Sequence, residues 1–313
     1  MHEDGRFDAQ TAKCSNQRRY PLAPIGGARI ATSLRCWAAA LFGDTISPFP
    51  ERLSLMTIPT PILDALTRAD ASWHPLLVQG LEAMMAATRD YLPQLANDQY
   101  LPTEQRLFAA FALPLDKVRY ILVGEGPYPR AESATGVCFM DGAVGSLWSD
   151  EQGGGLSKPV NKATSLRNFM KMLLVADGQL APDNTGGEAM AAVAARARSG
   201  SGSHIQTLVE MQQKLIEQGF LLLNASLVFR SHVAPARDAK AWLPFFETVM
   251  AGLAAQAPNT PTMVLWGKIA ELLGKLPVMK DFPQISAEHP YNLSFIGNRD
   301  MHQLFQPMQL LKG

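Results

Sequence analysis

Residues 118–129 read VRYILVGEGPYP, and this stretch decides the fold. Its first six residues are mostly aliphatic or β-branched, and Gly124 ends the run. This pattern is typical of a short buried strand followed by a glycine- and proline-containing loop. Two more short apolar runs, at residues 220–223 and 262–266, have the same character, and residues 284–287 are expected to form a fourth strand. We therefore predict four strands.

Segments with helical periodicity lie before, between and after these strands. Apolar residues recur at the spacing of one helix face in residues 73–92, 104–112, 165–174, 205–218, 242–255, 268–276 and 301–311. We expect Ser165 to be the N-cap of its helix. Strands alternating with helices indicate a parallel sheet covered on both faces. The predicted fold class is α/β: a three-layer αβα arrangement around a central four-stranded, mainly parallel sheet.

The sequence divides into two unequal parts. Residues 1–55 mix Gly, Pro, Arg and Ser and lack a sustained apolar period. We interpret them as a disordered leader or a spurious upstream extension that packs little against the rest. Residues 56–313 then form one domain. Within it, residues 177–204 are rich in Gly and Ala and read as a surface insertion with one short helix.

Composition excludes several classes of protein. Hydrophobic residues make up 47% of the chain and charged residues 18%, so the chain as a whole is not disordered. Lys and Arg together equal Asp and Glu at 28 each, which does not favour a strongly basic nucleic-acid binder. No apolar run reaches the roughly 18 residues of a transmembrane helix.

The cysteines point to a reducing compartment. Only Cys14, Cys36 and Cys138 occur, far apart in the sequence. A disulfide framework is therefore not expected, a cytoplasmic location fits, and a four-cysteine metal site is excluded. We expect no metal and no cofactor.

Unusual residues follow each predicted strand. They are the segment GEGPY at 124–128, then Asn224, then Gly267 and Lys268, and finally His289 and Pro290. Because ligands bind beyond the carboxyl ends of parallel strands, these four loops are expected to meet at one pocket.

These motifs resemble those of the uracil-DNA glycosylase superfamily, and family 1 most of all. The GQDPYH motif of that family corresponds to GEGPYP (124–129), and its Gly-x-Cys-Phe segment to GVCF (136–139). Its LLLN segment is intact at residues 221–224, LLWG appears as VLWG (264–267), and HPSPLS appears as HPYNLS (289–294). The resemblance spans residues 72–311 and implies DNA base-excision repair: hydrolysis of the N-glycosidic bond of a base flipped out of the helix.

The resemblance also implies a role for each matching residue. Phe139 would stack on the flipped base, and Asn224 would read N3–H and O4 of uracil. Tyr128 would exclude the methyl group of thymine, and His289 would donate a hydrogen bond to O2 of the leaving base. From the residues alone, each also fits a structural part: a core Phe, a strand-end Asn, a packed loop Tyr, a surface His.

Contacts with DNA follow from the same resemblance. Leu293 would wedge into the base stack, and Ser165, Lys268 and Ser294 would contact the DNA backbone. Lys158, Lys162 and Arg299 are further candidates for phosphate contacts. Residues 230–240 contain three basic residues and one acidic residue, which gives a local excess of two positive charges. The expected partner is DNA, single- or double-stranded, bound by a monomer, with no membrane involved.

The first motif departs from the family pattern where the chemistry matters most. The aspartate that assists water in the family is Gly126 here, the preceding Gln is Glu125, and the final His is Pro129. Glycine has no side chain that can act as a base. Three explanations remain open: Glu125 takes the role, Asp141 or Glu288 reaches in, or the pocket binds a base without cleaving it efficiently.

Two main hypotheses follow. The first is a uracil-DNA glycosylase-like enzyme with weak or altered activity, in which Glu125 and His289 are the catalytic candidates. The second is a catalytically silent DNA- or base-binding protein on the same fold. A third is a nucleotide hydrolase that uses the same base pocket.

Overall fold

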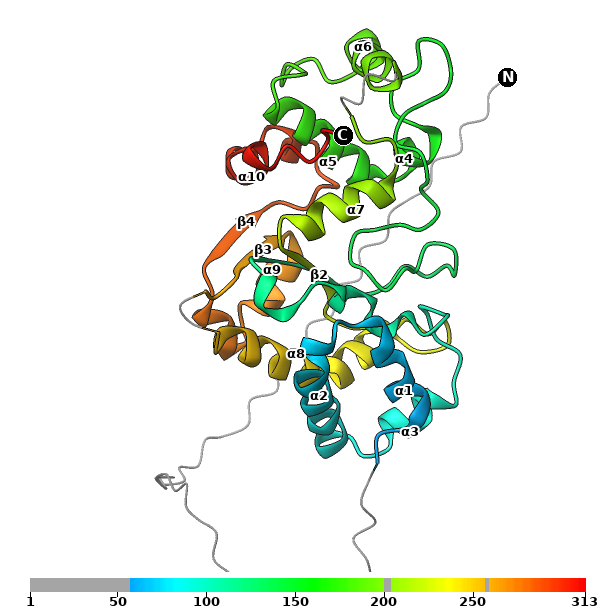
Figure 1. The fold of residues 1–313 in the computed structure, drawn as a ribbon, viewed down its shortest axis with the longest axis vertical. Helices are drawn as coiled ribbons and strands as arrows, with labels where there is room; N and C mark the ends of the chain where they lie inside the picture. The colour runs from blue at the N-terminus through cyan, green and yellow to red at the C-terminus, as the bar shows by residue number, and fades with distance from the viewer. Residues whose placement is uncertain (1–56, 200–203, 257–258) are drawn as a thin grey trace, which may run out of the picture. The chain divides into compact units, whose positions relative to one another are not determined.

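A four-stranded parallel sheet forms the centre of the domain. The computed structural model describes residues 57–199, 204–256 and 259–313 (Figure 1). The strands are β1 (Tyr120–Gly124), β2 (Phe220–Asn224), β3 (Thr262–Trp266) and β4 (Gln284–Ala287). They lie in the order β2-β1-β3-β4, and every pair is parallel. The predicted α/β class and the parallel sheet are confirmed.

Alternate strand residues face two separate cores. Leu122, Leu222 and Val264 belong to one hydrophobic cluster, whereas Val123, Leu223 and Leu265 belong to the other. Successive side chains of a strand point to opposite faces, so strands that are apolar on both faces must be covered on both. This explains why β1, β2 and β3 read as continuous apolar runs, whereas the edge strand β4 has alternately exposed residues.

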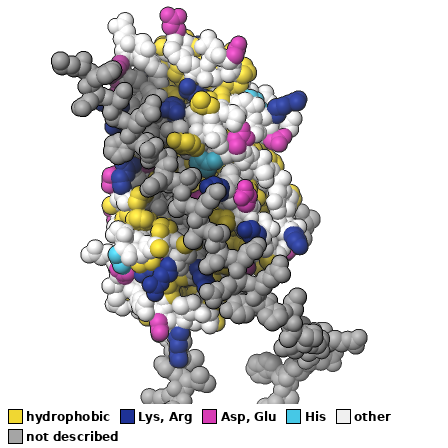
Figure 2. Space-filling model, turned by 180° about the vertical axis from the view of Figure 1, so that it is seen from behind, with side chains coloured by type: hydrophobic (Ala, Val, Ile, Leu, Met, Phe, Trp, Pro, Cys, Tyr) yellow, Lys and Arg dark blue, Asp and Glu magenta, His cyan; other side chains and the backbone are white. Residues whose placement is uncertain are grey.

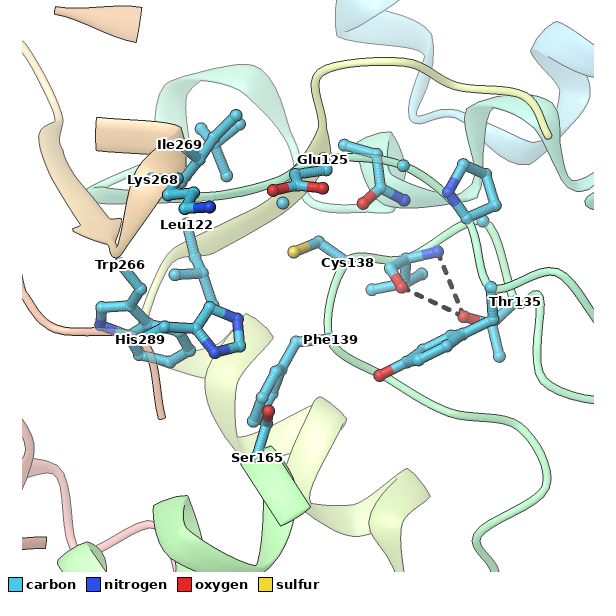
Figure 3. Close-up of a pocket in the computed structure, with 18 residues that line it drawn as sticks. Leu122, Glu125, Thr135, Cys138, Phe139, Ser165, Trp266, Lys268, Ile269 and His289 are labelled. Atoms are coloured by element: carbon cyan, nitrogen blue, oxygen red, sulfur yellow. Dashed lines mark hydrogen bonds between the residues drawn. The ribbon is translucent and has the colours of Figure 1, made fainter. Parts of the chain in front are cut away.

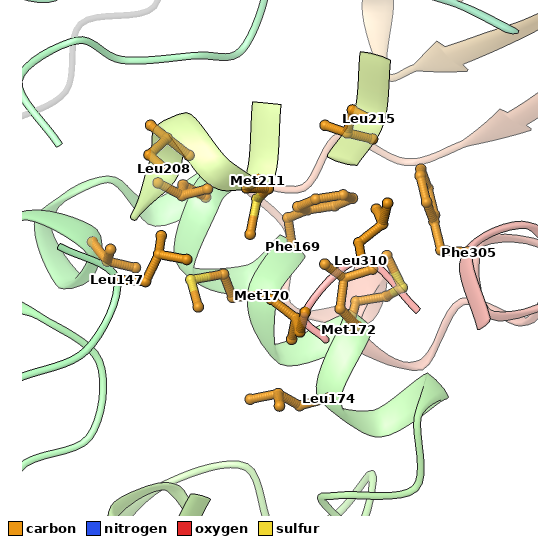
Figure 4. Close-up of a cluster of buried hydrophobic side chains, with 14 of the residues drawn as sticks. Leu147, Phe169, Met170, Met172, Leu174, Leu208, Met211, Leu215, Phe305 and Leu310 are labelled. Atoms are coloured by element: carbon orange, nitrogen blue, oxygen red, sulfur yellow. The ribbon is translucent and has the colours of Figure 1, made fainter. Parts of the chain in front are cut away.

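Helices supply the two outer layers. The first cluster packs the sheet against α5 (Thr164–Ala176), α6 (Gly187–Arg198), α7 (Leu208–Glu217) and α10 (Arg299–Phe305). Figure 4 shows part of it, with Phe169, Met211 and Phe305 brought together from three of these helices. The second cluster uses α2 (His74–Ala87), α3 (Tyr91–Ala96), α8 (Pro235–Ala254) and α9 (Lys268–Leu273). The three-layer αβα arrangement is therefore also confirmed.

Shorter elements complete the domain. They are α1 (Thr60–Asp64), α4 (Lys158–Lys162) and a set of 3-10 helices at Ala65–Arg68, Ala71–Trp73, Arg106–Ala112, Leu115–Lys117, Pro277–Asp281, Leu293–Gly297 and Gln306–Met308. No helix within the described ranges is both long enough and apolar enough to cross a membrane.

Several helix boundaries differ from those predicted: the helix predicted over 242–255 begins at Pro235, and the one predicted over 301–311 ends at Phe305. The helix predicted over 73–92 ends at Ala87, and α3 begins at Tyr91 and contains Pro93 in its first turn. A proline is tolerated there because the first turn leaves its N–H groups unpaired anyway. The predicted N-cap at Ser165 was wrong: α5 begins at Thr164, while Ser157 caps α4 by accepting a hydrogen bond from the Val160 N–H.

Of the two proposed peripheral segments, the first lies outside the described residues and the second is described in part. Residues 1–55, interpreted as a leader, lie outside the described residues. Within 177–204, residues 200–203 also lie outside them. Helix α6 buries Met190, Val193, Ala194 and Ala197 against the first cluster, so this segment contributes side chains to the core.

A buried ionic network fixes the loop after β2. Arg230 donates to both oxygens of Asp238 and, at 3.0 Å, to Asp98, while the Tyr91 hydroxyl donates to Asp238 at 2.8 Å. The Arg230 and Asp238 side chains are only 8% and 2% exposed. Arg230 is therefore not available to DNA. With Asp98 counted, three basic residues (Arg230, Arg237 and Lys240) face two carboxylates, an excess of one charge instead of the predicted two.

Removal of Asp238 should destabilise the domain severely. An Asp238→Ala variant leaves the buried Arg230 without its main partner, and breaking such a pair costs about 3–5 kcal/mol. Urea unfolding measures the loss. The control is Glu104→Ala, because Glu104 pairs with Arg106 at 3.9 Å on the surface, where a pair contributes less than about 1 kcal/mol. Equal losses for the two variants would contradict the structural role of the network.

Charges of both signs are distributed over the surface. Figure 2 shows basic and acidic side chains scattered across the visible face of the molecule. This agrees with equal numbers of basic and acidic residues in the sequence. Long-range electrostatic attraction to DNA is therefore expected to be modest, and binding must depend on local contacts.

Candidate functional site

The four strand-end loops meet at one cavity. Gly124 and Asn224 are paired in the register of β1 and β2, so the loops that follow them start side by side. The Ser226 N–H donates to the Glu125 carbonyl at 3.1 Å and holds the two loops together. The cavity has a volume of about 340 Å³ (Figure 3). Its lining includes Glu125, Tyr128, Phe139, Ser165, Asn224, Lys268 and His289.

Phe139 provides an aromatic surface inside the cavity. Its ring lies edge-to-face with Phe169 and with Trp266, each at a centroid distance of 5.3 Å. Its backbone has φ +68°, a left-handed conformation that costs energy for a bulky residue and is found mainly where the surroundings impose it. The Cys138 N–H donates to the Leu222 carbonyl at 3.0 Å, so β2 holds this segment in place.

The turn that presents Phe139 requires a glycine. Gly136 has φ +84°, and a Cβ atom there would lie 2.2 Å from the Arg106 carbonyl oxygen. The Thr135 hydroxyl donates to the Met140 carbonyl at 2.9 Å and spans the same turn. The GVCF segment is therefore fixed by local packing.

Asn224 brings an unpaired amide to the cavity. It is the last residue of β2 and only 4% exposed. Within the described residues its side chain has no hydrogen-bond partner. The amide lines the cavity, where it can form up to four hydrogen bonds with a ligand. A Cβ atom on Gly124 would lie 2.9 Å from Asn224 Oδ1, so glycine at 124 leaves space for the amide.

His289 is held in one tautomer. Its Nδ1 accepts a hydrogen bond from the Tyr291 N–H at 3.1 Å. In the neutral ring the proton is therefore on Nε2, which is free to donate. Partial burial lowers the pKa of His289, and the Glu125 carboxylate raises it by a smaller amount. Gly267, with φ +64°, allows the close approach, because a Cβ atom there would lie 2.7 Å from His289 Cβ.

The electrostatic contact between His289 and Glu125 can be tested by titration. In a Glu125→Gln variant the pKa of His289 should fall further below its usual value, because the carboxylate that raises it is gone. The proton resonances of the ring, followed by NMR from pH 4 to 8, give this value. His204 lies outside the cavity and should titrate unchanged. A rise, or no change, in the pKa of His289 would contradict the contact.

Glu125 is the only Asp or Glu lining the cavity among the described residues. Its carboxylate has no hydrogen bond or ion pair in that part of the chain. The two other candidates for the missing carboxylate are engaged elsewhere and do not line the cavity. Asp141 pairs with Arg130 at 3.5 Å and accepts from the Ala143 N–H, and Glu288 accepts from the Asn298 amide at 2.7 Å.

Gly126 lies beside Glu125 and leaves room for a side chain. A Cβ atom there would be 3.6 Å from the Ser226 carbonyl oxygen, an ordinary contact distance, and its backbone does not require glycine. The position that carries aspartate in the family pattern is therefore sterically able to carry one here.

Three other predicted site residues also line the cavity. Burial raises the pKa of Tyr128, which keeps its hydroxyl neutral. Ser165 lies in the first turn of α5, and Lys268 is the first residue of α9. Figure 3 shows Ser165 near Phe139, and Lys268 on the side of Glu125.

Leu293 and Ser294 do not line the cavity. Both are exposed in the 3-10 helix that follows the His289 loop, and Leu293 is 69% exposed. Lys158, Lys162 and Arg299 are likewise exposed. No group of three or more metal-ligating side chains gathers in the described ranges.

Sequence reasoning missed Asn168. This residue of α5 is fully buried, and its amide donates to the Pro290 carbonyl at 2.8 Å and to the Tyr291 carbonyl at 3.3 Å. It therefore anchors the loop that carries His289. The available signal in the sequence was the polar Asn168 directly before the apolar residues Phe169 and Met170.

Comparison with known proteins identifies the family. No protein-family model matches the chain. The wild-type UNG of Nitratifractor salsuginis has a solved structure that is 39% identical, covers 80% of this chain and 96% of its own, and has a TM-score of 0.72. Curated relatives include uracil-DNA glycosylase 2 of Bacteroides fragilis, 29% identical over 64% of this chain and 75% of its own length. Another is the uracil-DNA glycosylase of Mycolicibacterium gilvum, 28% identical over 72% and 82%. The chain belongs to the uracil-DNA glycosylase superfamily.

Proposed function

We propose that the chain is a DNA N-glycosylase that hydrolyses the bond between deoxyribose and a flipped uracil or closely related base. The observation that carries this proposal is the cavity that joins the Phe139 ring, the unpaired Asn224 amide and the Nε2–H of His289. Relatives named uracil-DNA glycosylase support the same reaction. A base inside a duplex is unreachable, so the substrate must be flipped out or single-stranded.

In this proposal three side chains recognise the base, those of Phe139, Asn224 and Tyr128. Phe139 stacks on the base, and its left-handed backbone keeps the ring in the cavity. The Asn224 amide accepts from N3–H and donates to O4, which distinguishes uracil from cytosine because cytosine reverses both groups. Tyr128 lies where the methyl group of thymine would enter.

Departure of the base requires stabilisation of negative charge. As the glycosidic bond breaks, its electron pair moves to the base and charge grows on O2. The Nε2–H of His289 donates to this oxygen, and its lowered pKa keeps the ring neutral at pH 7. A preorganised donor of this kind contributes about 3–4 kcal/mol to the transition state.

Water attack requires a base, and Glu125 is the candidate. In this proposal its free carboxylate orients and deprotonates the water that attacks C1′, and it balances the positive charge that develops on the sugar. Its position one residue before the family's aspartate makes the geometry suboptimal. We therefore expect uracil release that is slow for a glycosylase.

Contacts with DNA come from two residues that line the cavity, Ser165 and Lys268, and from the exposed Leu293 and Ser294. Leu293 wedges into the stack, and Ser165, Lys268 and Ser294 contact the backbone. All proposed site residues belong to one domain, which supports action as a monomer. The three cysteines, which lie far apart in the sequence, fit a reducing compartment such as the cytoplasm.

A uracil-release assay on single-stranded DNA tests the proposal. Oligonucleotides with one uracil, thymine or cytosine are incubated with excess protein, and the free base is quantified. We expect slow release of uracil and none of the other two bases. Tight binding of uracil-DNA without release would instead support a silent base-binding protein, and release from free deoxyuridine alone would support a nucleotide hydrolase.

A further inference from the structure

Lys268 introduces a primary amine into the base cavity. It is the only Lys or Arg that lines the cavity in the described part of the chain, which it shares with Glu125 and His289. In the family pattern this position of the VLWG-K segment carries serine. Lysine and serine both bind phosphate, but only the amine can form a carbon–nitrogen double bond with an aldehyde.

The amine is not engaged by the protein. Lys268 is exposed and lines the cavity, and within the described ranges it has no ion pair or hydrogen bond. Figure 3 shows its side chain extending toward the side where the Glu125 carboxylate lies. The amine is therefore free to react with a group in the cavity, which Lys268 lines together with Phe139, the residue proposed to stack on the flipped base.

The product of base removal is the matching electrophile. An abasic deoxyribose opens reversibly to an aldehyde at C1′, the atom from which the base has departed. The cavity that binds the base therefore brings this carbon close to its own lining. Holding two reactants together in this way raises the rate of their reaction strongly.

We propose that Lys268 attacks C1′ of an abasic deoxyribose, so that the chain is also an abasic-site lyase. This goes beyond the proposed glycosylase reaction and acts on its product. The Lys268 nitrogen bonds to C1′, the aldehyde oxygen leaves as water, and a protonated imine forms. Loss of a C2′ proton then creates the C2′=C3′ double bond and expels the phosphate from C3′. Water hydrolyses the imine, which frees the amine and releases an unsaturated aldehyde.

Glu125 is the proton acceptor for both steps. It takes the proton that the Lys268 ammonium must lose before attack, and then the proton at C2′. Its carboxylate has no competing partner in the described residues, and no other carboxylate lines the cavity there. The reaction needs no metal, oxidant or reductant.

Borohydride trapping on preformed abasic DNA tests the inference. Sodium borohydride reduces the imine to a stable amine, which joins protein and DNA in one band on a denaturing gel. We expect wild-type protein to give this adduct, and peptide mapping to locate it at Lys268. Lys268→Arg keeps the positive charge but cannot form the imine, so trapping should fall by at least about tenfold. Lys117→Arg and Lys280→Arg are the matched controls, because both lysines are exposed and neither lines the cavity, and they should trap like the wild type.

The outcomes separate the two proposals. Preformed abasic DNA already lacks its base, so the lyase can be tested without uracil excision. An adduct on this DNA, together with no release of uracil from uracil-DNA, would support the lyase proposal and reject the glycosylase proposal. Lack of an adduct with wild-type protein, or equal trapping by Lys268→Arg, would overturn the lyase. Binding of abasic DNA by both proteins without an adduct would show that Lys268 contacts phosphate only.

Discussion

A Glu125→Gln variant should release uracil about 10²–10⁴ times more slowly than the wild type. Glutamine has nearly the same shape as glutamate but cannot take a proton from water. Because no other carboxylate lines the cavity in the described part of the chain, no neighbour should substitute for it. Single-turnover release from single-stranded uracil-DNA measures the rate of the chemical step.

The loss must be specific to the cavity. Glu217→Gln alters an exposed residue at the end of α7 and should leave the rate unchanged. Thermal unfolding should show that Glu125→Gln is as stable as the wild type, since the carboxylate forms no hydrogen bond or ion pair in the described structure. If uracil release survived Glu125→Gln, the base would be a residue that the structure does not place in the cavity.

The second large effect is expected at His289. Removal of its ring in His289→Ala should slow uracil release by about 10²–10³-fold, which is the cost of losing one preorganised donor to a developing oxyanion. Binding of uracil-DNA should change much less, because the bond to O2 strengthens only as charge develops. The loss should therefore appear in the single-turnover rate and not in the affinity.

Two further variants control for this result. His289→Gln retains an N–H donor and should recover part of the lost rate. His74→Gln removes a ring that contacts the Leu66 carbonyl, outside the cavity, and should have no effect on catalysis. A fall in affinity equal to the fall in rate would show that His289 only binds the base.

Much of the fold could be predicted because three of the four strands, β1, β2 and β3, are buried on both faces. Strand β2 is apolar at residues 220–223 and ends at Asn224, with all five residues buried, so its limits are clear in the sequence. Helix limits were harder to predict. Pro93 suggested the end of a helix but lies in the first turn of the next one, and the Ser157 cap, not Ser165, begins the segment that leads into α5.

The convergence of the site could also be predicted, whereas its supports could not. The strand-end rule places Asn224 and His289 at one edge of a parallel sheet. No sequence rule reveals that Asn168 holds the His289 loop, because its hydrogen-bond partner, the Pro290 carbonyl, lies 122 residues further along the chain. Sequence could not choose between Glu125, Asp141 and Glu288 either. That choice depends on which carboxylate is already paired, as Asp141 is with Arg130.

Moving the carboxylate by one residue tests the central claim, that a single cavity carboxylate serves the reaction. Gly126→Asp alone should give only a small gain, because two adjacent carboxylates raise each other's pKa. In the Glu125→Gln/Gly126→Asp double variant, the new side chain has room beside Ser226 and stands at the family's position. The account predicts that single-turnover uracil release by this variant recovers about 10²–10⁴-fold over Glu125→Gln. A double variant as slow as Glu125→Gln, folded and bound to uracil-DNA, would contradict it.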